Sequence, residues 1–305
     1  MIVTSPIQFL ALAEQCDPEA GLSAVPRGVF LIEPSEFHVS TATAGDNEYM
    51  DISSGVDAER ALAQHRQLQS VIRGLGLEVR CFPGDAAQPD GVFLNNAFAT
   101  IPGNLIIGRM ATEERQRETG RADVREYFSN EVGYHEQDLS GQDLVAELTG
   151  VMILDRSRRI GYCGMTQRVD PAGCEAMHSA FDNRLTFQFD LNPEEYHTNV
   201  VMSVLAGRAC VMVPDAFADQ EVPAAIAAAY PGRTLLLSAE EKRSFSGNCI
   251  ALTDTDVLMS VAGAQGLSQA NHRKLADWGF TLHTVELSEL EKAGGSLRCL
   301  IAELF

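Results

Sequence analysis

A cysteine near the end of the chain, Cys299, is the residue best placed to do chemistry. It follows two glycines and an arginine in the segment Gly294 to Phe305, inside a terminal apolar run. The thiolate is the reactive form of cysteine, and Arg298 would favour it if its side chain turned toward the sulfur. Taken alone, the segment fits a buried strand cysteine better than a nucleophile. The catalytic interpretation becomes the stronger one only together with His197 and Glu147.

Polar side chains recur just before or inside the first strand of successive predicted hairpins. A cysteine, a histidine and carboxylates in one cavity would provide a nucleophile with a general acid/base. Each residue also has a structural explanation, because His197 could satisfy a turn, Glu147 could end a solvated helix and Asn95-Asn96 could cap a turn. The remaining histidines lie in polar or helical contexts and are predicted to be at the surface. The candidates are Asp90, Asn95, Asn96, Glu147, His197, Asn199 and Asn248.

The elements that would position these residues repeat along the chain. Four segments each contain two apolar β-rich runs joined by a tight polar turn, and the turns recur about every fifty residues. Each is followed by a helical stretch and a short strand. The hairpins are predicted at 92–107, 151–162, 200–213 and 250–259, and the later helices at 171–182, 221–230 and 268–278.

A fifth copy is expected to join the two ends of the chain. It contains a strand near 29–32, a helix at 57–75 and a strand at 77–82, and its missing strand would be the one that carries Cys299. The fold class is therefore α/β, a closed ring of about five ββαβ units whose strand ends converge on a central axis. No linker or low-complexity segment interrupts the sequence, so residues 1–305 are assigned to one domain.

Composition narrows the function classes. The 305 residues carry a formal charge of −19, which argues against binding to nucleic acid or to anionic membrane surfaces. No apolar run is long enough for a transmembrane helix, and the N-terminal residues do not fit a secretory signal, so a cytoplasmic protein is expected. The seven cysteines form no CxxC pair and are odd in number, which favours reduced thiols and predicts neither a metal site nor a cofactor.

These segments resemble the guanidino-group modifying superfamily, also called the amidinotransferase or pentein fold. The resemblance rests on motifs in the family's order from about residue 28 onward. It is closest to the bacterial branch that contains citrulline-utilising hydrolases. It implies five ββαβ units around a pseudo-fivefold axis. The motifs are PD-x-VF-x-NN at 89–96, E-x-TG at 147–150, HTNV at 197–200, F-x-GN at 245–248 and GG-x-x-RC at 294–299.

The resemblance also implies roles for individual residues. Cys299 would attack the guanidino or ureido carbon, His197 would protonate the leaving nitrogen and later activate water, and Glu147 would orient that histidine. Asp90 would lie near the guanidino end of the substrate. Arg168 would bind the substrate carboxylate with its planar fork of donors. The other substrate-binding positions are Asn95, Asn96, Asn199 and Asn248.

Two departures from the family pattern concern the substrate. Asn95, Asn96 and Asn199 stand where related enzymes carry acids that hold a guanidinium cation. Neutral amides match a ureido group, which favours a citrulline-like substrate, or an enzyme that carries both steps through to the amine. Asp90 and Glu147 could still balance one cation. In the loop at 37–50, Ser40, Ala42 and Met50 replace the branch's Asn, Glu and Gln, so the tail recognised here would differ from plain citrulline.

The function that this sequence favours is a cofactor-free cysteine hydrolase that cleaves the ureido or guanidino C–N bond of a citrulline- or arginine-like amino acid and releases ammonia. One alternative is an amidinotransferase, or an activity of the arginine deiminase or dimethylarginine hydrolase type. Another is a non-catalytic binder of small molecules on the same fold. The expected partner is a small-molecule amino acid. The sequence leaves the oligomeric state open, a homodimer included.

Overall fold

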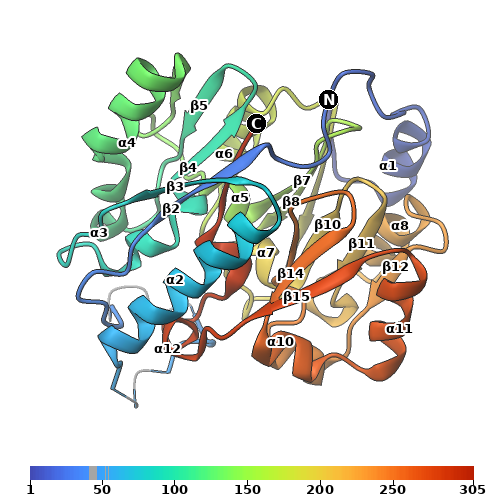
Figure 1. Cartoon of the computed structure of the whole chain (residues 1–305). Helices are drawn as coiled ribbons and strands as arrows, with labels where there is room; N and C mark the ends of the chain where they lie inside the picture. Colours follow the sequence, from blue (N-terminus) through green and yellow to red (C-terminus); the bar gives the residue numbers. More distant parts are fainter. Residues whose placement is uncertain (41–46, 52, 54) are drawn as a thin grey trace.

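A computed structural model describes residues 1–40, 47–51, 53 and 55–305 of the chain. Within these residues the strands form five sheets, and every sheet contains an antiparallel pair with a third strand parallel to it (Figure 1). Four units follow the chain order: β4 (Phe98–Ile101), β5 (Asn104–Ile107) and β6 (His135–Asp138); β7 (Met152–Asp155), β8 (Ile160–Met165) and β9 (Leu185–Asp190); β10 (Met202–Leu205), β11 (Ala209–Met212) and β12 (Thr234–Leu236); β13 (Ile250–Ala251), β14 (Asp256–Ser260) and β15 (Thr281–Val285).

The fifth unit joins the two ends of the chain, as the sequence predicts. Strand β16 (Ala302–Leu304) pairs antiparallel with β2 (Gly28–Ile32), which pairs parallel with β3 (Glu78–Phe82). The first strands of the units meet around an axis, where β16 contacts β4, and β10 contacts both β7 and β13. The architecture is therefore the expected α/β propeller of five ββαβ units. The assignment of residues 1–305 to one domain stays a prediction.

Turn and capping chemistry explains where these elements begin and end. Ala206 and Gly207 join β10 to β11 with φ angles of 49° and 65°, the paired positive values of a tight hairpin turn. Asp57 caps helix α2 (Ala58–Gly74) by accepting a hydrogen bond from the Arg60 amide. Asp170 caps α6 (Pro171–Ala180), whose proline occupies the first turn.

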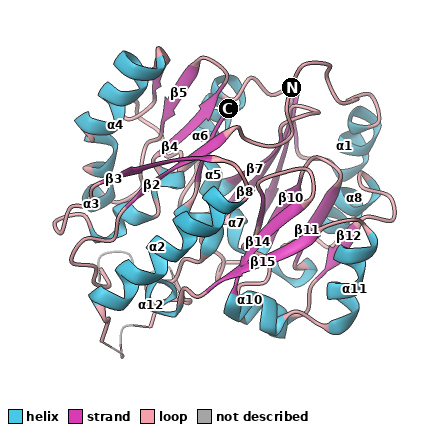
Figure 2. Cartoon of the chain, in the orientation of Figure 1, coloured by secondary structure: helices cyan, strands magenta, loops and turns pink. Residues whose placement is uncertain are grey.

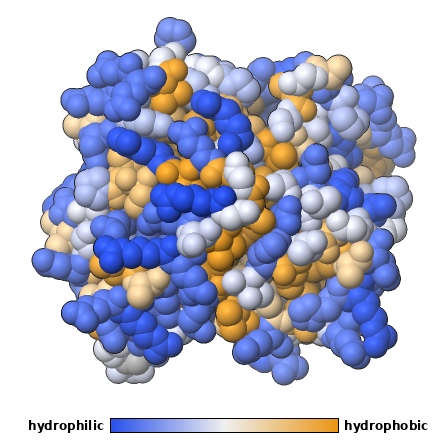
Figure 3. Space-filling model, viewed as in Figure 1, coloured by the Kyte–Doolittle hydropathy of each residue, from blue (hydrophilic) through white to orange (hydrophobic). Residues whose placement is uncertain are grey.

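Most helices lie on the periphery, outside the strands (Figure 2). Apolar side chains on the visible face gather in a band near the junction of α2 with β14 and β15 (Figure 3). No helix among the described residues is long and apolar enough to cross a membrane. Besides α2 and α6, the helices are α1 (Pro6–Ala13), α3 (Glu113–Gln116), α4 (Ala122–Glu126), α5 (Leu148–Val151), α7 (Thr198–Val201), α8 (Glu221–Ala228), α9 (Ala239–Arg243), α10 (Val261–Gly266), α11 (Gln269–Asp277) and α12 (Ser288–Glu291), with short turns η1 (Pro89–Val92), η2 (Leu94–Asn96), η3 (Glu118–Gly120), η4 (Tyr127–Val132), η5 (Pro214–Ala216) and η6 (Leu297–Leu300).

Two strand predictions are wrong. The C-terminal strand was expected to carry Cys299, but Cys299 lies in the helical turn η6 and the strand β16 begins only at Ala302. The apolar run at residues 92–94 lies in the helical turns η1 and η2, and the first strand of that unit begins only at Phe98. A short buried apolar run fits a strand or a helical turn equally well, so periodicity could not separate them. The sequence also did not predict β1 (Ile2–Val3), which adds a fourth strand beside β9.

Candidate active site

Short helical turns place the candidate residues at equivalent positions, each just before the first strand of a unit. Asn96 ends η2 before β4, Glu147 precedes α5 and β7, His197 precedes α7 and β10, and Cys299 lies in η6 before β16. These turns contact one another, because η2 packs against both η6 and α5, and α7 packs against both α5 and η6. The predicted convergence of these strand ends on the axis is confirmed.

Cys299 is buried and held by two amide side chains. Asn248 Nδ2 donates a hydrogen bond to the sulfur at 3.3 Å, and Asn199 Oδ1 lies 3.6 Å from it. Burial raises the pKa of the Cys299 thiol, and a backbone hydrogen bond of Ser296, the Asn248 amide and the charge of Arg298 oppose that rise. The Arg298 guanidinium hydrogen-bonds Ile301 O and Glu303 instead of turning to the sulfur. The cysteine is therefore a protonated thiol at neutral pH.

His197 and Glu147 form a fully buried pair, with 2.7 Å between Nε2 and Oε2. Burial would raise the pKa of Glu147, but Arg168, the His197 hydrogen bond and Arg115 hold it well below its usual range. Because an ionised carboxylate only accepts hydrogen bonds, His197 Nε2 carries the proton. Burial also lowers the pKa of His197, despite the opposing effect of Glu147. The imidazole is therefore neutral, and its Nδ1 is the unprotonated nitrogen that can accept a hydrogen bond.

That bare nitrogen is suited to general base chemistry. Among the described residues, His197 Nδ1 has no hydrogen-bond partner although it is buried. The backbone beside the pair is unusual as well, since Leu148 has a φ of 26° directly after Glu147. Such conformations cluster at functional sites, where the surrounding structure enforces them. The pair can therefore take a proton at Nδ1 and return it to a leaving group.

Two arginines surround the same carboxylate. Arg168 Nη1 lies 3.3 Å from Glu147 Oε1, and Arg115 Nη1 lies 3.5 Å from Glu147 Oε2. Arg115 also forms a two-pronged ion pair with Glu118, at 3.0 and 2.9 Å. Burial raises the pKa of Glu118 to about 7, against the opposing charge of Arg115.

Arg115 was not predicted as a site residue. It lies in the charged segment 113–118, a pattern that usually indicates a solvated helix face. The spacing of Arg115 and Glu118, three residues apart on one helical face, is the only local signal that could have marked it.

A small cavity of ≈ 20 Å³ opens beside Cys299, with room for about one water molecule. An amino acid of the size of arginine can enter only if the lining side chains move. Gly295 packs against the Phe93 ring, where an added Cβ would lie 2.7 Å from the ring, and this close approach explains the glycine. The cavity is lined by Asn47, Asp90, Phe93, Asn96, Arg115, Arg168, Tyr196, Ala293, Gly295 and Cys299.

The structure thus places eight of the nine predicted site residues in three groups. Asp90, Asn96, Arg168 and Cys299 line the cavity, and Asn199 and Asn248 contact the sulfur. His197 and Asn96 both lie next to Gly150, where an added Cβ would be 2.5 Å from Asn96 Oδ1 and 3.0 Å from the His197 ring, and Glu147 is hydrogen-bonded to that ring.

Asn95 is the candidate that points elsewhere. Its amide donates to Thr149 Oγ1 at 3.1 Å, and the Thr149 hydroxyl donates back to Asn95 O at 3.0 Å. Asn95 therefore links η2 to α5, and it is not among the residues that line the cavity.

Two of the three residues at which the 37–50 loop departs from the family pattern lie among the described residues. Ser40 hydrogen-bonds Glu114 and Met50 forms a β-bridge with Ala293, whereas Ala42 lies outside the described residues.

Within the described part of the chain, no three His, Cys, Asp or Glu side chains gather as metal ligands would.

Comparison with known proteins shows related sequences. The chain is 27% identical over 279 residues to the N(G),N(G)-dimethylarginine dimethylaminohydrolase of Mycobacterium tuberculosis, covering 90% of this chain and 84% of that protein. It is 25% identical over 245 residues to the bifunctional arginine dihydrolase/ornithine cyclodeaminase ArgZ of Synechocystis, covering 79% of this chain but only 33% of ArgZ. The chain therefore spans about a third of the length of that relative.

Solved structures share the fold. The N-terminal domain of ArgZ, in a mutant form bound to its substrate, matches with a TM-score of 0.78 at 23% identity, over 90% of this chain and 97% of that one. A dimethylarginine dimethylaminohydrolase adduct matches with a TM-score of 0.70 at 16% identity, over 92% and 100%. The family model described as "N,N dimethylarginine dimethylhydrolase, eukaryotic" matches residues 33–305. The chain therefore belongs to this family of the guanidino-group modifying superfamily.

Proposed function

We propose that the chain hydrolyses a C–N bond in the guanidino or ureido group of a small amino acid, through a covalent intermediate on Cys299 and without a cofactor. The observation that carries this proposal is the buried neutral His197, whose Nε2 is held by an ionised Glu147 and whose Nδ1 is left without a partner, beside the turn that carries Cys299. Family membership supports the class of reaction, because the relatives are described as hydrolases of arginine or dimethylarginine.

The reaction would proceed in two halves. Cys299 Sγ forms a bond to the central carbon of the head group as the thiol proton passes to His197. The histidine then gives this proton to the leaving nitrogen, the C–N bond breaks and an amine or ammonia departs. Water next attacks the carbon attached to the sulfur while His197 takes its proton. The C–S bond breaks, and the thiol recovers its proton from His197.

For the head group, we propose a guanidino substrate whose hydrolysis continues past the ureido stage to the amine. Asp90 provides a carboxylate at the cavity that could balance a guanidinium cation, and Asn96 provides neutral donors for a ureido oxygen. ArgZ and its Nostoc relative AgrE are both described as arginine dihydrolases.

The carboxylate at the amino-acid end of the substrate would bind to an arginine side chain of the protein. Arg168 lies at the cavity and offers a planar pair of donors, which suits a carboxylate. Arg115, held by Glu118, would add a second positive charge. Because Arg168 contacts Glu147 in this structure, substrate binding would bring a second carboxylate to the same guanidinium.

Dimethylarginine hydrolysis is the second candidate, favoured by the family model and by the Mycobacterium tuberculosis relative.

One experiment distinguishes the two proposed activities. The protein is incubated with L-arginine, L-citrulline and dimethylarginine, and ammonia, dimethylamine, citrulline and ornithine are quantified, with Cys299→Ser as the control. The proposal predicts one ornithine, two molecules of ammonia and one of carbon dioxide from each arginine and two waters. Arginine turnover that stops at citrulline would refute the two-step reaction, and release of dimethylamine alone would favour the second candidate. Labelling of Cys299 by a haloacetamidine would distinguish either enzyme from a binding protein.

A further inference from the structure

A second and much larger cavity opens at the other end of the propeller strands. Three first strands run from the catalytic turns toward it, since Asn96 precedes β4, Glu147 precedes β7 and Cys299 precedes β16. The residues that follow these strands line the new cavity, which has a volume of ≈ 520 Å³. Strands β4 and β7 have four residues each, which corresponds to about 13 Å between their ends. The two cavities are therefore separate.

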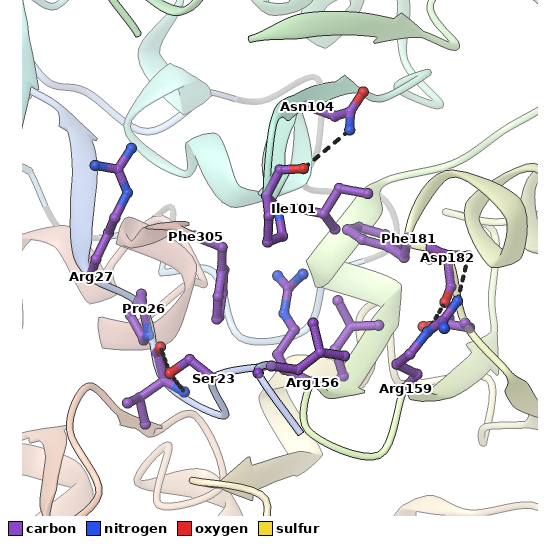
Figure 4. A pocket seen from close by; sticks show the side chains of 16 residues that line it. Ser23, Pro26, Arg27, Ile101, Asn104, Arg156, Arg159, Phe181, Asp182 and Phe305 are labelled. Carbon is purple, nitrogen blue, oxygen red and sulfur yellow. Dashed lines mark hydrogen bonds and ion pairs between the residues drawn. The ribbon is translucent and has the colours of Figure 1, made fainter. Parts of the chain in front are cut away.

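The wall of this cavity is apolar on two sides and carries a buried cation. Phe181, Phe305 and Ile101 line the cavity, and the Arg156 guanidinium lies between them (Figure 4). Its central carbon lies 4.3 Å from the centre of the Phe305 ring and 5.5 Å from that of Phe181. Aromatic faces stabilise a guanidinium and hold it in one orientation. The cation is thus positioned in advance of any ligand.

Arg156 keeps unused hydrogen-bond donors. Nη1 donates to Thr100 O at 3.0 Å, whereas Nε has no hydrogen-bond acceptor within the described residues and Nη2 has only an ion pair with Glu303 Oε2 at 3.6 Å; the side chain is only 10% exposed. Arg159, which lines the same cavity, is already occupied by Asp182 and Glu19. Arg27 is exposed and donates to the Tyr134 hydroxyl. Of the three arginines that line the cavity, Arg156 is the one prepared to take an anion.

The charge balance around Arg156 points the same way. Its nearest carboxylate, Glu303, lies 3.6 Å away but is closer to a second buried arginine, Arg298, at 3.1 Å. Two guanidinium groups thus share the Glu303 carboxylate. Burial lowers the pKa of Arg156, Glu303 opposes this effect and Arg298 adds to it. An anion beside Arg156 would give this guanidinium a partner that it does not share with Arg298.

We infer that this cavity is a binding site for a small organic monoanion with an apolar or aromatic body. The anion would accept hydrogen bonds from Nε and Nη2 of Arg156, and the apolar body would pack against Phe181, Phe305 and Ile101. The volume falls within the range of cavities that bind small molecules, about 300–1,000 Å³. The site requires neither Cys299 nor His197, so it is independent of the proposed reaction.

Calorimetric titration of the whole protein with 3-phenylpropanoate tests this inference, with 3-phenylpropan-1-ol as the uncharged analogue of the same shape. The acid should bind at least about tenfold more tightly than the alcohol, because only the acid pairs with Arg156. Arg156→Met keeps the apolar stem and should weaken binding of the acid by at least about tenfold. The matched control Arg159→Met removes an arginine from the same cavity and should leave the affinity within about twofold.

The position of the ligand can be read directly. A crystal soaked with 3-(4-bromophenyl)propanoate should show the anomalous signal of bromine beside Phe181 and Phe305. Equal affinity for acid and alcohol, no binding of the acid, or a bromine signal in the catalytic cavity would each overturn the inference. The comparison of acid with alcohol uses the unmodified protein, so the inference stays refutable even if Arg156→Met fails to fold.

Discussion

Replacing Glu147 with glutamine changes the group that holds His197 and should almost abolish turnover while the fold survives. The carboxylate accepts from His197 Nε2 at 2.7 Å, from the Ala111 amide at 3.1 Å and from Arg168 at 3.3 Å. A glutamine oxygen can keep the last two contacts, but its NH₂ group would face Nε2 as a donor. His197 would have to accept there and carry its proton on Nδ1. The nitrogen that should act as the base would then be blocked.

The size of both effects follows from this geometry. A wrong histidine tautomer after the equivalent change in a serine protease triad costs about 10⁴ in kcat, and we expect a loss of about 10³–10⁴ for Glu147→Gln. Removing one charge of a buried ion pair costs about 3–5 kcal/mol. With 305 residues and an unfolding entropy of about 2.1 cal/mol/K per residue, Tm should fall by about 5–8 °C.

The assay compares kcat for ammonia release from L-arginine with Tm in the same preparations. Glu289→Gln is the matched control, since Glu289 is a buried carboxylate paired with Lys292 and Arg60 outside the catalytic cavity. It should lower Tm but leave kcat within about threefold. A Glu147→Gln protein that folds and keeps more than a tenth of the normal kcat would refute the assigned roles of the pair.

The remaining predictions concern other parts of the chain. His197→Ala should lower kcat about 10²–10⁴-fold, and a loss below tenfold would contradict general acid/base catalysis. Gly150→Ala should lower kcat at least about tenfold and Tm by about 2–5 °C, because overpacking a buried site costs about 1–3 kcal/mol and the new Cβ would displace Asn96 and His197; unchanged kinetics would show that their positions do not matter. Metal chelators should leave activity intact, and loss of activity that returns only with Zn²⁺ or Mn²⁺ would refute this. Tm should fall as pH drops from about 6.5 toward 4, because burial lowers the pKa of His65 to about 4 and the unfolded chain therefore takes up its proton first; His65→Gln should show a smaller fall, and an equal fall would assign the effect to other groups.

The sequence predicted the fold well because its signals are repeated. Hairpin turns such as Ala206-Gly207 and helix caps such as Asp57 and Asp170 are local chemistry, and similar signals occur in several units. Closure of the ring through β16 and β2 followed from counting units. The short turns η2, α5, α7 and η6 were missed because three or four residues are too few to show helical periodicity.

The site was predicted less completely, for physical reasons that lie outside local sequence. Arg115 and Glu118 look like surface charges, yet tertiary contacts bury them against Glu147. His65 was expected at the surface but is fully buried on the inner face of α2. Arg298 neighbours Cys299 in sequence, but its side chain pairs with Glu303. Chain neighbours do not determine where a long side chain ends.

The most direct test of the central claim is to trap the enzyme during turnover and weigh it. Acid quenching of the wild-type protein within milliseconds of mixing with excess L-arginine, followed by intact-mass and peptide mass spectrometry, should reveal an adduct on Cys299 with the mass of arginine less ammonia, or a carbamoyl adduct from the second stage. Cys299→Ser should show no adduct and no turnover, because a serine hydroxyl is essentially never ionised at neutral pH. Turnover that proceeds without any adduct on Cys299, or that persists above a tenth of normal in Cys299→Ser, would contradict the covalent mechanism.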